Sequence, residues 1–174
     1  APSLGPGPPR ALRLRRRHPA PWDVSGITDM GGLFYNLKNF NADISNWDTS
    51  GVTNMKRMFK DNHKFNQPLS FDTSSVTSMH MMFWHAEGFN QPLSFDTSKV
   101  TEMYGMFWGA RAFNQLLSFD TSSVTNMNSI FYGSLGGRLI FTDTASLTMA
   151  VQAYNTDPTA AIATYGPVAN WDVS

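Results

Sequence analysis

The sequence predicts a repeat solenoid, in which successive copies of one short unit stack around a continuous hydrophobic core. An aromatic residue followed by Asp recurs every 24 or 25 residues, and Val, Thr, Met, Phe and Asn markers recur in step with it. One unit of this length cannot bury its own apolar side, whereas stacked copies can. The aromatic markers are Trp22, Trp47, Phe71, Phe95 and Phe119.

Each unit is expected to contain two short strands that lie parallel to those of the next unit. In the third unit, the segments Leu69–Phe71 and Val76–Met79 alternate apolar and polar residues, as strands do. Residues 72–75 between them read Asp-Thr-Ser-Ser, whose side chains bond nearby backbone donors in turns. Strands of successive units would then form parallel ladders about 4.8 Å apart.

A tight helical turn is expected after the second strand. Met79, Met82 and Phe83 have the i, i+3, i+4 spacing of one helical face. We therefore predict a five-repeat solenoid over residues 21–141. Its Val, Met, Phe and Leu columns form the interior, and the methionines fill gaps in it.

The repeat pattern stops after Phe131, where residues 134–137 interrupt the coil. We expect a last strand over residues 138–141 and a helical segment over residues 142–169, with helices at 144–154 and from 158 to about 165. This segment either caps a following array or folds back over the exposed end of this one. Residues 170–174 repeat the Trp-Asp-Val-Ser motif of the first unit, which suggests a segment of a longer repeat protein.

Composition excludes several classes of function. The chain has 174 residues, 13 basic and 13 acidic groups and no cysteine. Disulfides, Cys-ligated zinc and thiol nucleophiles are therefore excluded. Residues 1–20 carry five arginines and no acid, so the rest of the chain is net acidic and lacks the basic footprint of a nucleic-acid-binding domain. We expect this basic, Pro/Gly-rich tail to be a disordered leader, with an anchor to nucleic acid or an anionic surface as the alternative. It lacks the apolar region of a secretory signal.

The segments FNADISNWDTSGVTNMKRMF and FNQPLSFDTSSVTSMHMMF resemble the BspA-like leucine-rich-repeat surface proteins, in their Trp-Asp-x-Ser and Val-Thr-x-Met form. The resemblance extends over residues 21–141. It implies a right-handed leucine-rich-repeat-like solenoid that is cell-surface or secreted and has an adhesive or binding role. That family has no shared catalytic residues, so none are carried over. Repeats three to five use Phe where the commonest pattern has Trp, which should alter packing but not the fold.

The position directly after the Phe that follows the second-strand segment of each unit (residues 34, 59, 83, 107 and 131) is a candidate partner-binding column. Because the preceding Phe faces the core, this position should point outward or lie at the rim, and in a solenoid its residues stack. Exposed aromatic columns recognise sugar faces, partner proteins or apolar ligands. The alternative is a second core layer packed over the turn. The column contains Tyr35, Lys60, Trp84, Trp108 and Tyr132.

Three polar columns also recur, and each has a structural explanation. Stacked Asp side chains repel one another, so we expect turn hydrogen bonds from Ser and Thr amides to offset the repulsion, with calcium as the alternative. Stacked Thr fits strand propensity and turn bonding, with ice binding as the alternative. Stacked Asn should satisfy backbone groups in the turns. The columns are Asp23, Asp48, Asp72, Asp96 and Asp120; Thr28, Thr53, Thr77, Thr101 and Thr125; and Asn41, Asn66, Asn90 and Asn114.

No catalytic, cofactor or metal site is predicted. His80 and His85 are spaced poorly for shared metal ligation, although Glu87 is nearby, and no Ser-His-Asp set, phosphate loop or zinc motif is present. We predict a non-enzymatic repeat protein that binds or adheres to a protein or glycan. A scaffold or accessory subunit of a larger assembly is the alternative. Specificity is assigned to the variable positions Lys56, Arg57, His80, Met81, Glu102, Tyr104 and Asn128.

Overall fold

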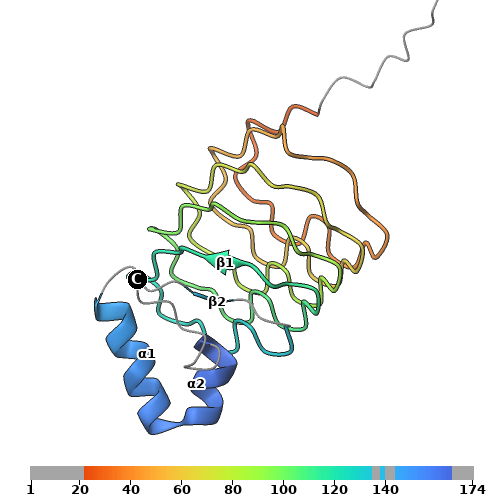
Figure 1. Cartoon of the computed structure of the whole chain (residues 1–174). Coiled ribbons are helices and arrows are strands. Elements are labelled where there is room, and N and C mark those ends of the chain that lie inside the picture. Colours follow the sequence, from red (N-terminus) through yellow and green to blue (C-terminus); the bar gives the residue numbers. More distant parts are fainter. Residues whose placement is uncertain (1–21, 135–137, 140–143, 166–174) are drawn as a thin grey trace, which may run out of the picture.

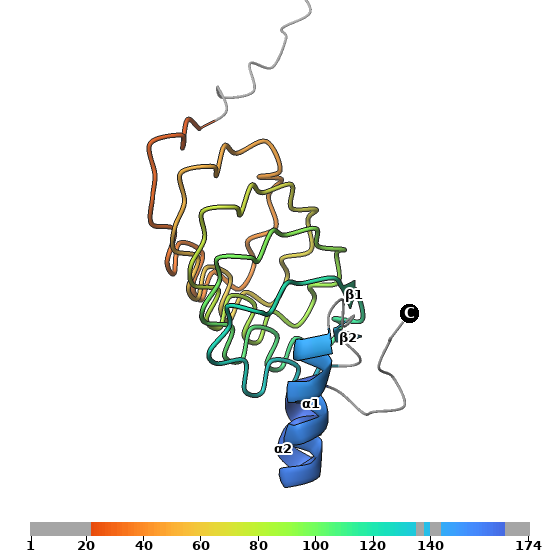
Figure 2. The same cartoon turned by 90° about the vertical axis from the view of Figure 1, so that its left-hand side faces the viewer.

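Residues 22–134 run as successive coils of similar shape that stack along one axis (Figures 1 and 2). The computed structural model describes residues 22–134, 138–139 and 144–165. Neighbouring coils are joined by parallel bridges of one residue each, and these bridges form a single row across the stack. The row contains Asp29, Asn54, Ser78, Glu102 and Asn126.

Regular secondary structure is sparse in the described residues. Strand β1 (Leu116–Leu117) pairs in parallel with strand β2 (Arg138–Leu139). Helix α1 spans Thr144–Thr156 and helix α2 spans Pro158–Tyr165, which confirms the two helices expected there. Of the strand expected over residues 138–141, the first two residues form β2 and the other two lie outside the described residues.

The short strands expected at residues 69–71 and 76–79 do not form as strands. Within these two segments only Ser78 bridges to neighbouring coils. On one side the Thr77 N–H donates to the Thr53 carbonyl oxygen at 2.8 Å, and the Met55 N–H donates to the Ser78 carbonyl oxygen at 3.0 Å. A turn begins at residue 80, so regular pairing does not extend beyond a single bridge.

The helical turn expected around Met79, Met82 and Phe83 is also wrong, because the chain forms consecutive β-turns there. Met81 and His85 have φ angles of 55° and 53°, in the left-handed region that interrupts a right-handed helix. The Met82 N–H donates to the Met79 carbonyl oxygen, which closes the first turn, whereas the Met81 and Phe83 N–H groups donate to carbonyl oxygens of the next coil. Alternate residues thus bond within the coil and between coils.

The predicted hydrophobic interior is confirmed. Val76, Met79, Met82 and Phe83 are fully buried, and their counterparts in the neighbouring coils are buried in the same way. Two columns of Phe rings run through the stack, with ring centroids 4.0 to 4.2 Å apart between the columns. These columns are Phe34, Phe59, Phe83, Phe107 and Phe131, and Phe40, Phe65, Phe89 and Phe113.

The two ends of the stack differ. The first coil leaves large apolar side chains exposed, among them Trp22 at 69%, Ile27 and Leu33. At the other end α1 and α2 lie beside the last coils (Figure 1), and Tyr165 of α2 packs against the core. Of the two placements considered for the helical segment, this contact favours folding back onto this array. The expectations for residues 1–20 and 170–174 fall outside the described residues.

Asn62 is a core position of the described coils where one coil carries a polar side chain and the next two carry Ala86 and Ala110. Its side chain is fully buried, and its Nδ2 has no hydrogen-bond partner among the described residues. The Phe65 N–H donates to Asn62 Oδ1, whereas the equivalent bonds in the next two coils go to the carbonyl oxygens of Ala86 and Ala110. An unsatisfied buried amide costs about 1–3 kcal/mol.

We therefore predict that Asn62→Ala raises the free energy of unfolding by about 1 kcal/mol, because the orphaned amide is removed and the residue 62 carbonyl can accept the Phe65 N–H. Urea unfolding monitored by circular dichroism measures the change. The matched control is Ala86→Asn, which introduces the same amide one coil later and should destabilise the protein. A destabilised Asn62→Ala variant would contradict this explanation.

Candidate binding surface

The structure brings the five residues of the candidate column together as one continuous stack. The rings of Trp84 and Trp108 stack with centroids 4.5 Å apart, and Tyr132 continues the stack 4.3 Å from Trp108. Lys60 takes the place of a ring, because its Nζ lies 5.7 Å from the Tyr35 centroid and 5.2 Å from the Trp84 centroid. Cation–π attraction therefore links the two aromatic parts of the column.

Stacking determines what this column presents to a partner. Trp84 and Trp108 are half-buried and each uses its ring faces on neighbours, so they offer mainly ring edges. Tyr35 and Tyr132 close the column at its two ends, and each is 51% exposed. The column thus combines features of a second packing layer along its length with open ring surface at its ends.

A second row of side chains runs beside the column. Tyr104 lies 6.3 Å from Trp84 and 5.5 Å from His80 between ring centroids. The two rows meet over Gly105, where a Cβ atom would lie 2.7 Å from Trp84 Cζ3. The missing side chain at Gly105 therefore gives Trp84 its position. Of the predicted variable positions, Glu102 and Asn128 are exposed further along the stack.

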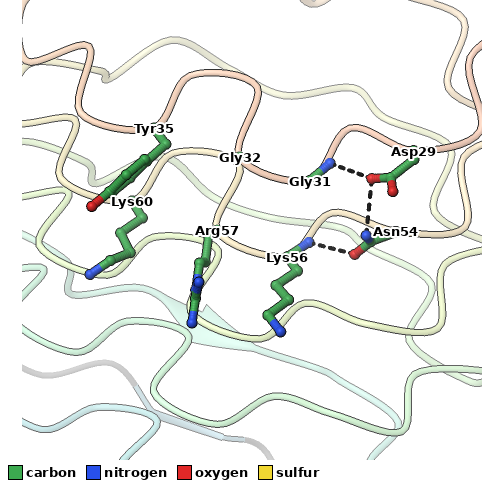
Figure 3. Close-up of a pocket in the computed structure, with 8 residues that line it drawn as sticks. All are labelled: Asp29, Gly31, Gly32, Tyr35, Asn54, Lys56, Arg57 and Lys60. Carbon is green, nitrogen blue, oxygen red and sulfur yellow. Dashed lines mark hydrogen bonds between the residues drawn. The ribbon is translucent and has the colours of Figure 1, made fainter.

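A pocket of about 370 Å³ lies where the column begins, between the first and second coils (Figure 3). The pocket is open because Gly31 and Gly32 have no side chains, whereas the same two positions of the next coil carry Lys56 and Arg57. Tyr35 and Lys60 belong to both the pocket and the column. The other lining residues are Asp29 and Asn54.

Hydrogen bonds hold the floor of the pocket in place. Asp29 Oδ1 accepts from the Gly31 N–H at 2.7 Å and from Asn54 Nδ2 at 2.9 Å. Asn54 Oδ1 in turn accepts from the Lys56 N–H at 3.0 Å (Figure 3). The sequence interpretation assigned Lys56, Arg57, Lys60 and Tyr35 to a surface but missed the pocket. The pocket could have been predicted from the pair Gly31 and Gly32, which stands at two positions that carry side chains in the following coil.

The pocket is cationic. Lys56, Arg57 and Lys60 line it against the single carboxylate of Asp29, while Lys60 also pairs with Asp61 outside it at 3.4 Å. The positive field reaches the next coil. Partial burial, followed by the charges of Lys56 and Arg57, lowers the pKa of His80, and Glu102 opposes this effect.

The Asp column is explained by turn hydrogen bonds, as predicted. In the first four coils the Ser two residues after the Asp donates both its N–H and its hydroxyl to the Asp carboxylate, as Ser74 does to Asp72. These bonds hold the pKa values of Asp23, Asp48, Asp72 and Asp96 below the ordinary Asp value. In the fifth coil the Ser122 N–H donates to Asp120.

The Thr and Asn columns also satisfy backbone groups. The Thr77 hydroxyl donates to the Thr53 carbonyl oxygen of the preceding coil, and this bond recurs along the column. Asn66 Oδ1 accepts the Asn90 N–H, and the same bond joins the other neighbouring Asn residues. The structural role predicted for the Asn column is therefore confirmed.

The histidines singled out in the sequence are used separately. His80 stacks on Tyr104, and His85 lies over Gly109 with its Nδ1 3.9 Å from Asp61 Oδ1. Among the described residues, no three His, Asp or Glu side chains gather as metal ligands. None of the helices in that part of the chain has the length and apolarity to cross a membrane.

Stacked, near-identical coils with fixed internal columns define the class of this chain as a repeat protein. The sequence profile of a family described as "Mycoplasma protein of unknown function, DUF285" matches residues 14–115 and again residues 92–173. The chain belongs to this family. No curated protein and no solved structure matches it.

Proposed function

We propose that this protein is a non-enzymatic, leucine-rich-repeat-like solenoid, related to the BspA-like surface proteins, that binds a glycan through its aromatic column. One observation carries the proposal. The stack from Tyr35 to Tyr132 is continuous across five coils and leads at one end into an open pocket. By resemblance, we place the protein at a cell surface or outside the cell.

The chemistry of this surface suits an extended carbohydrate chain. Exposed tyrosine rings at the column ends offer apolar faces and hydroxyl groups, and aromatic side chains combine an apolar body with a polar tip. The column repeats along the stack axis, so successive sugar units can contact successive coils. Binding and not catalysis is proposed because the polar columns are committed to turn and inter-coil hydrogen bonds.

The proposal is tested by measuring the affinity of the intact protein and of a Trp84→Ala/Trp108→Ala variant for arrayed glycans. We expect this double variant to lose at least about tenfold in affinity, since buried aromatic anchors dominate binding energies. Trp22→Ala is the control, because Trp22 is exposed but lies outside the column. Equal affinity in the column variant and the intact protein would exclude the column as the binding site.

A second candidate function is a scaffold within a larger assembly. The observation that favours it is the apolar edge of the first coil, where Trp22, Ile27, Leu33 and Leu37 are exposed. An edge of this kind stacks against another coil or a partner protein. Sedimentation of the purified protein tests this candidate, and a monodisperse monomer at high concentration would argue against self-stacking.

A further inference from the structure

We infer that the pocket between the first and second coils binds a carboxylated sugar, so that the glycan recognised by this protein is an acidic polysaccharide. This inference rests on the proposed glycan-binding function and names the class of glycan. It depends on three properties of the pocket: its open shape, its excess of cations and its single hydrogen-bond-accepting carboxylate.

The pocket is a local departure from the repeat, not a feature of every coil. Gly31 and Gly32 stand where the third coil carries His80 and Met81 and the fourth carries Tyr104 and Gly105. The floor of the pocket leaves no room for a side chain at position 31, because a Cβ at Gly31 would lie 2.9 Å from Asp29 Oδ1 and 3.0 Å from Asn54 Nδ2. Gly32 has a φ of 66° and open space above it, because a Cβ added there would meet only Tyr35 Cβ, at 3.8 Å.

The charges in the pocket favour an anionic group. Lys56 and Arg57 are exposed and make no ion pair among the described residues, so both can turn to a ligand. In Figure 3 their side chains, with that of Lys60, project from the second coil below Tyr35. The Arg57 guanidinium and the Lys56 ammonium are suited to a carboxylate, which Arg binds in bidentate fashion, whereas the Lys60 ammonium also pairs with Asp61.

Asp29 and Tyr35 favour a sugar over a simple anion or an acidic peptide. Asp29 Oδ1 is occupied by two donors, whereas Oδ2 has no hydrogen bond among the described residues and can accept one from a ligand hydroxyl. A carboxylate in an anion site is unfavourable unless the ligand also donates hydrogen bonds. Tyr35 adds an exposed ring at the wall. Hydroxyls, an apolar ring face and a carboxylate occur together in a hexuronic acid.

The test is calorimetric titration of the full chain with a short oligogalacturonate and with its methyl ester, which has the same skeleton without the charge. We expect the acid to bind at least about tenfold more tightly than the ester and to weaken as salt is raised. Lys56→Gln/Arg57→Asn should abolish the preference, and Asn tolerates the left-handed conformation that Arg57 adopts. Lys64→Gln/Lys99→Gln removes the same charge elsewhere on the exposed surface and should retain it.

A second variant tests the pocket without altering charge. Gly32→Met places in the first coil the residue that Met81 provides in the third, at a similar φ, and should fill the pocket and reduce acid binding to the level of the ester. Equal binding of acid and ester that is lost only in the Trp84→Ala/Trp108→Ala variant would overturn the pocket inference and leave the glycan proposal standing. Binding of neither ligand would also overturn the pocket inference, and binding to the arrayed glycans then decides the glycan proposal separately.

Discussion

Replacing Phe83 by Ala is expected to lower the free energy of unfolding by about 3–5 kcal/mol. The Phe83 ring is fully buried and stacks on Phe59, Phe89 and Phe107, with centroids 5.4, 4.2 and 5.5 Å away. Its removal leaves a cavity in the middle of the stack, where coils on both sides depend on the same ring. Coils cannot close the gap independently, because inter-coil hydrogen bonds fix their spacing.

Equilibrium unfolding in urea measures the loss for Phe83→Ala, with two comparisons. Phe131→Ala removes the same ring from the last coil, where Phe107 is its stacking partner, and should cost less. Leu116→Ala truncates a side chain that is 50% exposed and should cost under about 1 kcal/mol. A loss below 1 kcal/mol for Phe83→Ala, with an unchanged dependence on urea, would show that the coils do not share one cooperative core.

The interior of the stack could be predicted from the sequence because a strict period leaves few choices for which positions of each coil are buried. Each apolar marker recurs with its neighbours, so every copy of Phe83 is buried. The copies of Val76 are buried in the inner coils, whereas Ile27 at the edge of the first coil is exposed. The same logic placed the aromatic column. Residues one period apart must lie over one another, and Trp84 and Trp108 do so with their rings stacked.

The local backbone could not be predicted in the same way. The i, i+3, i+4 spacing of Met79, Met82 and Phe83 fits a helical face, yet β-turns with left-handed residues bury the same three side chains. Arg57 and Met81 occupy left-handed positions without being glycine, which conceals the pattern in the second and third coils. Glycine marks this position only in the first and fourth coils, as Gly32 and Gly105, and the fifth coil has Ser129 there.

The pocket was missed because it follows from a difference between coils. The consensus of the repeat unit hides Gly31 and Gly32, because most of the other coils carry side chains at these two positions. Once the coils are stacked, the absence of two side chains beside Lys56 and Arg57 becomes an open space lined by cations. The period therefore locates the aromatic column, whereas a departure from the period locates the pocket.

Gly105→Ala is the second substitution for which a large effect is expected, a loss of about 1–3 kcal/mol in the free energy of unfolding. The new Cβ would lie 2.7 and 2.8 Å from two atoms of the Trp84 ring, which is held between Lys60 and Trp108 and cannot move aside freely. The left-handed φ of 57° adds strain, although Met81 accepts the same conformation.

Met81→Ala and Met81→Gly together separate these two causes, because they differ by one Cβ at a left-handed position of the preceding coil, where Met81 already carries a Cβ. We expect these two variants to differ in the free energy of unfolding by under about 1 kcal/mol. Near-ultraviolet circular dichroism supplies a second measurement, since displacement of Trp84 from Trp108 should weaken the signal of the stacked indoles in Gly105→Ala alone. A difference between Met81→Ala and Met81→Gly as large as the loss in Gly105→Ala, with that signal intact, would attribute the effect to backbone strain and not to the contact that positions Trp84.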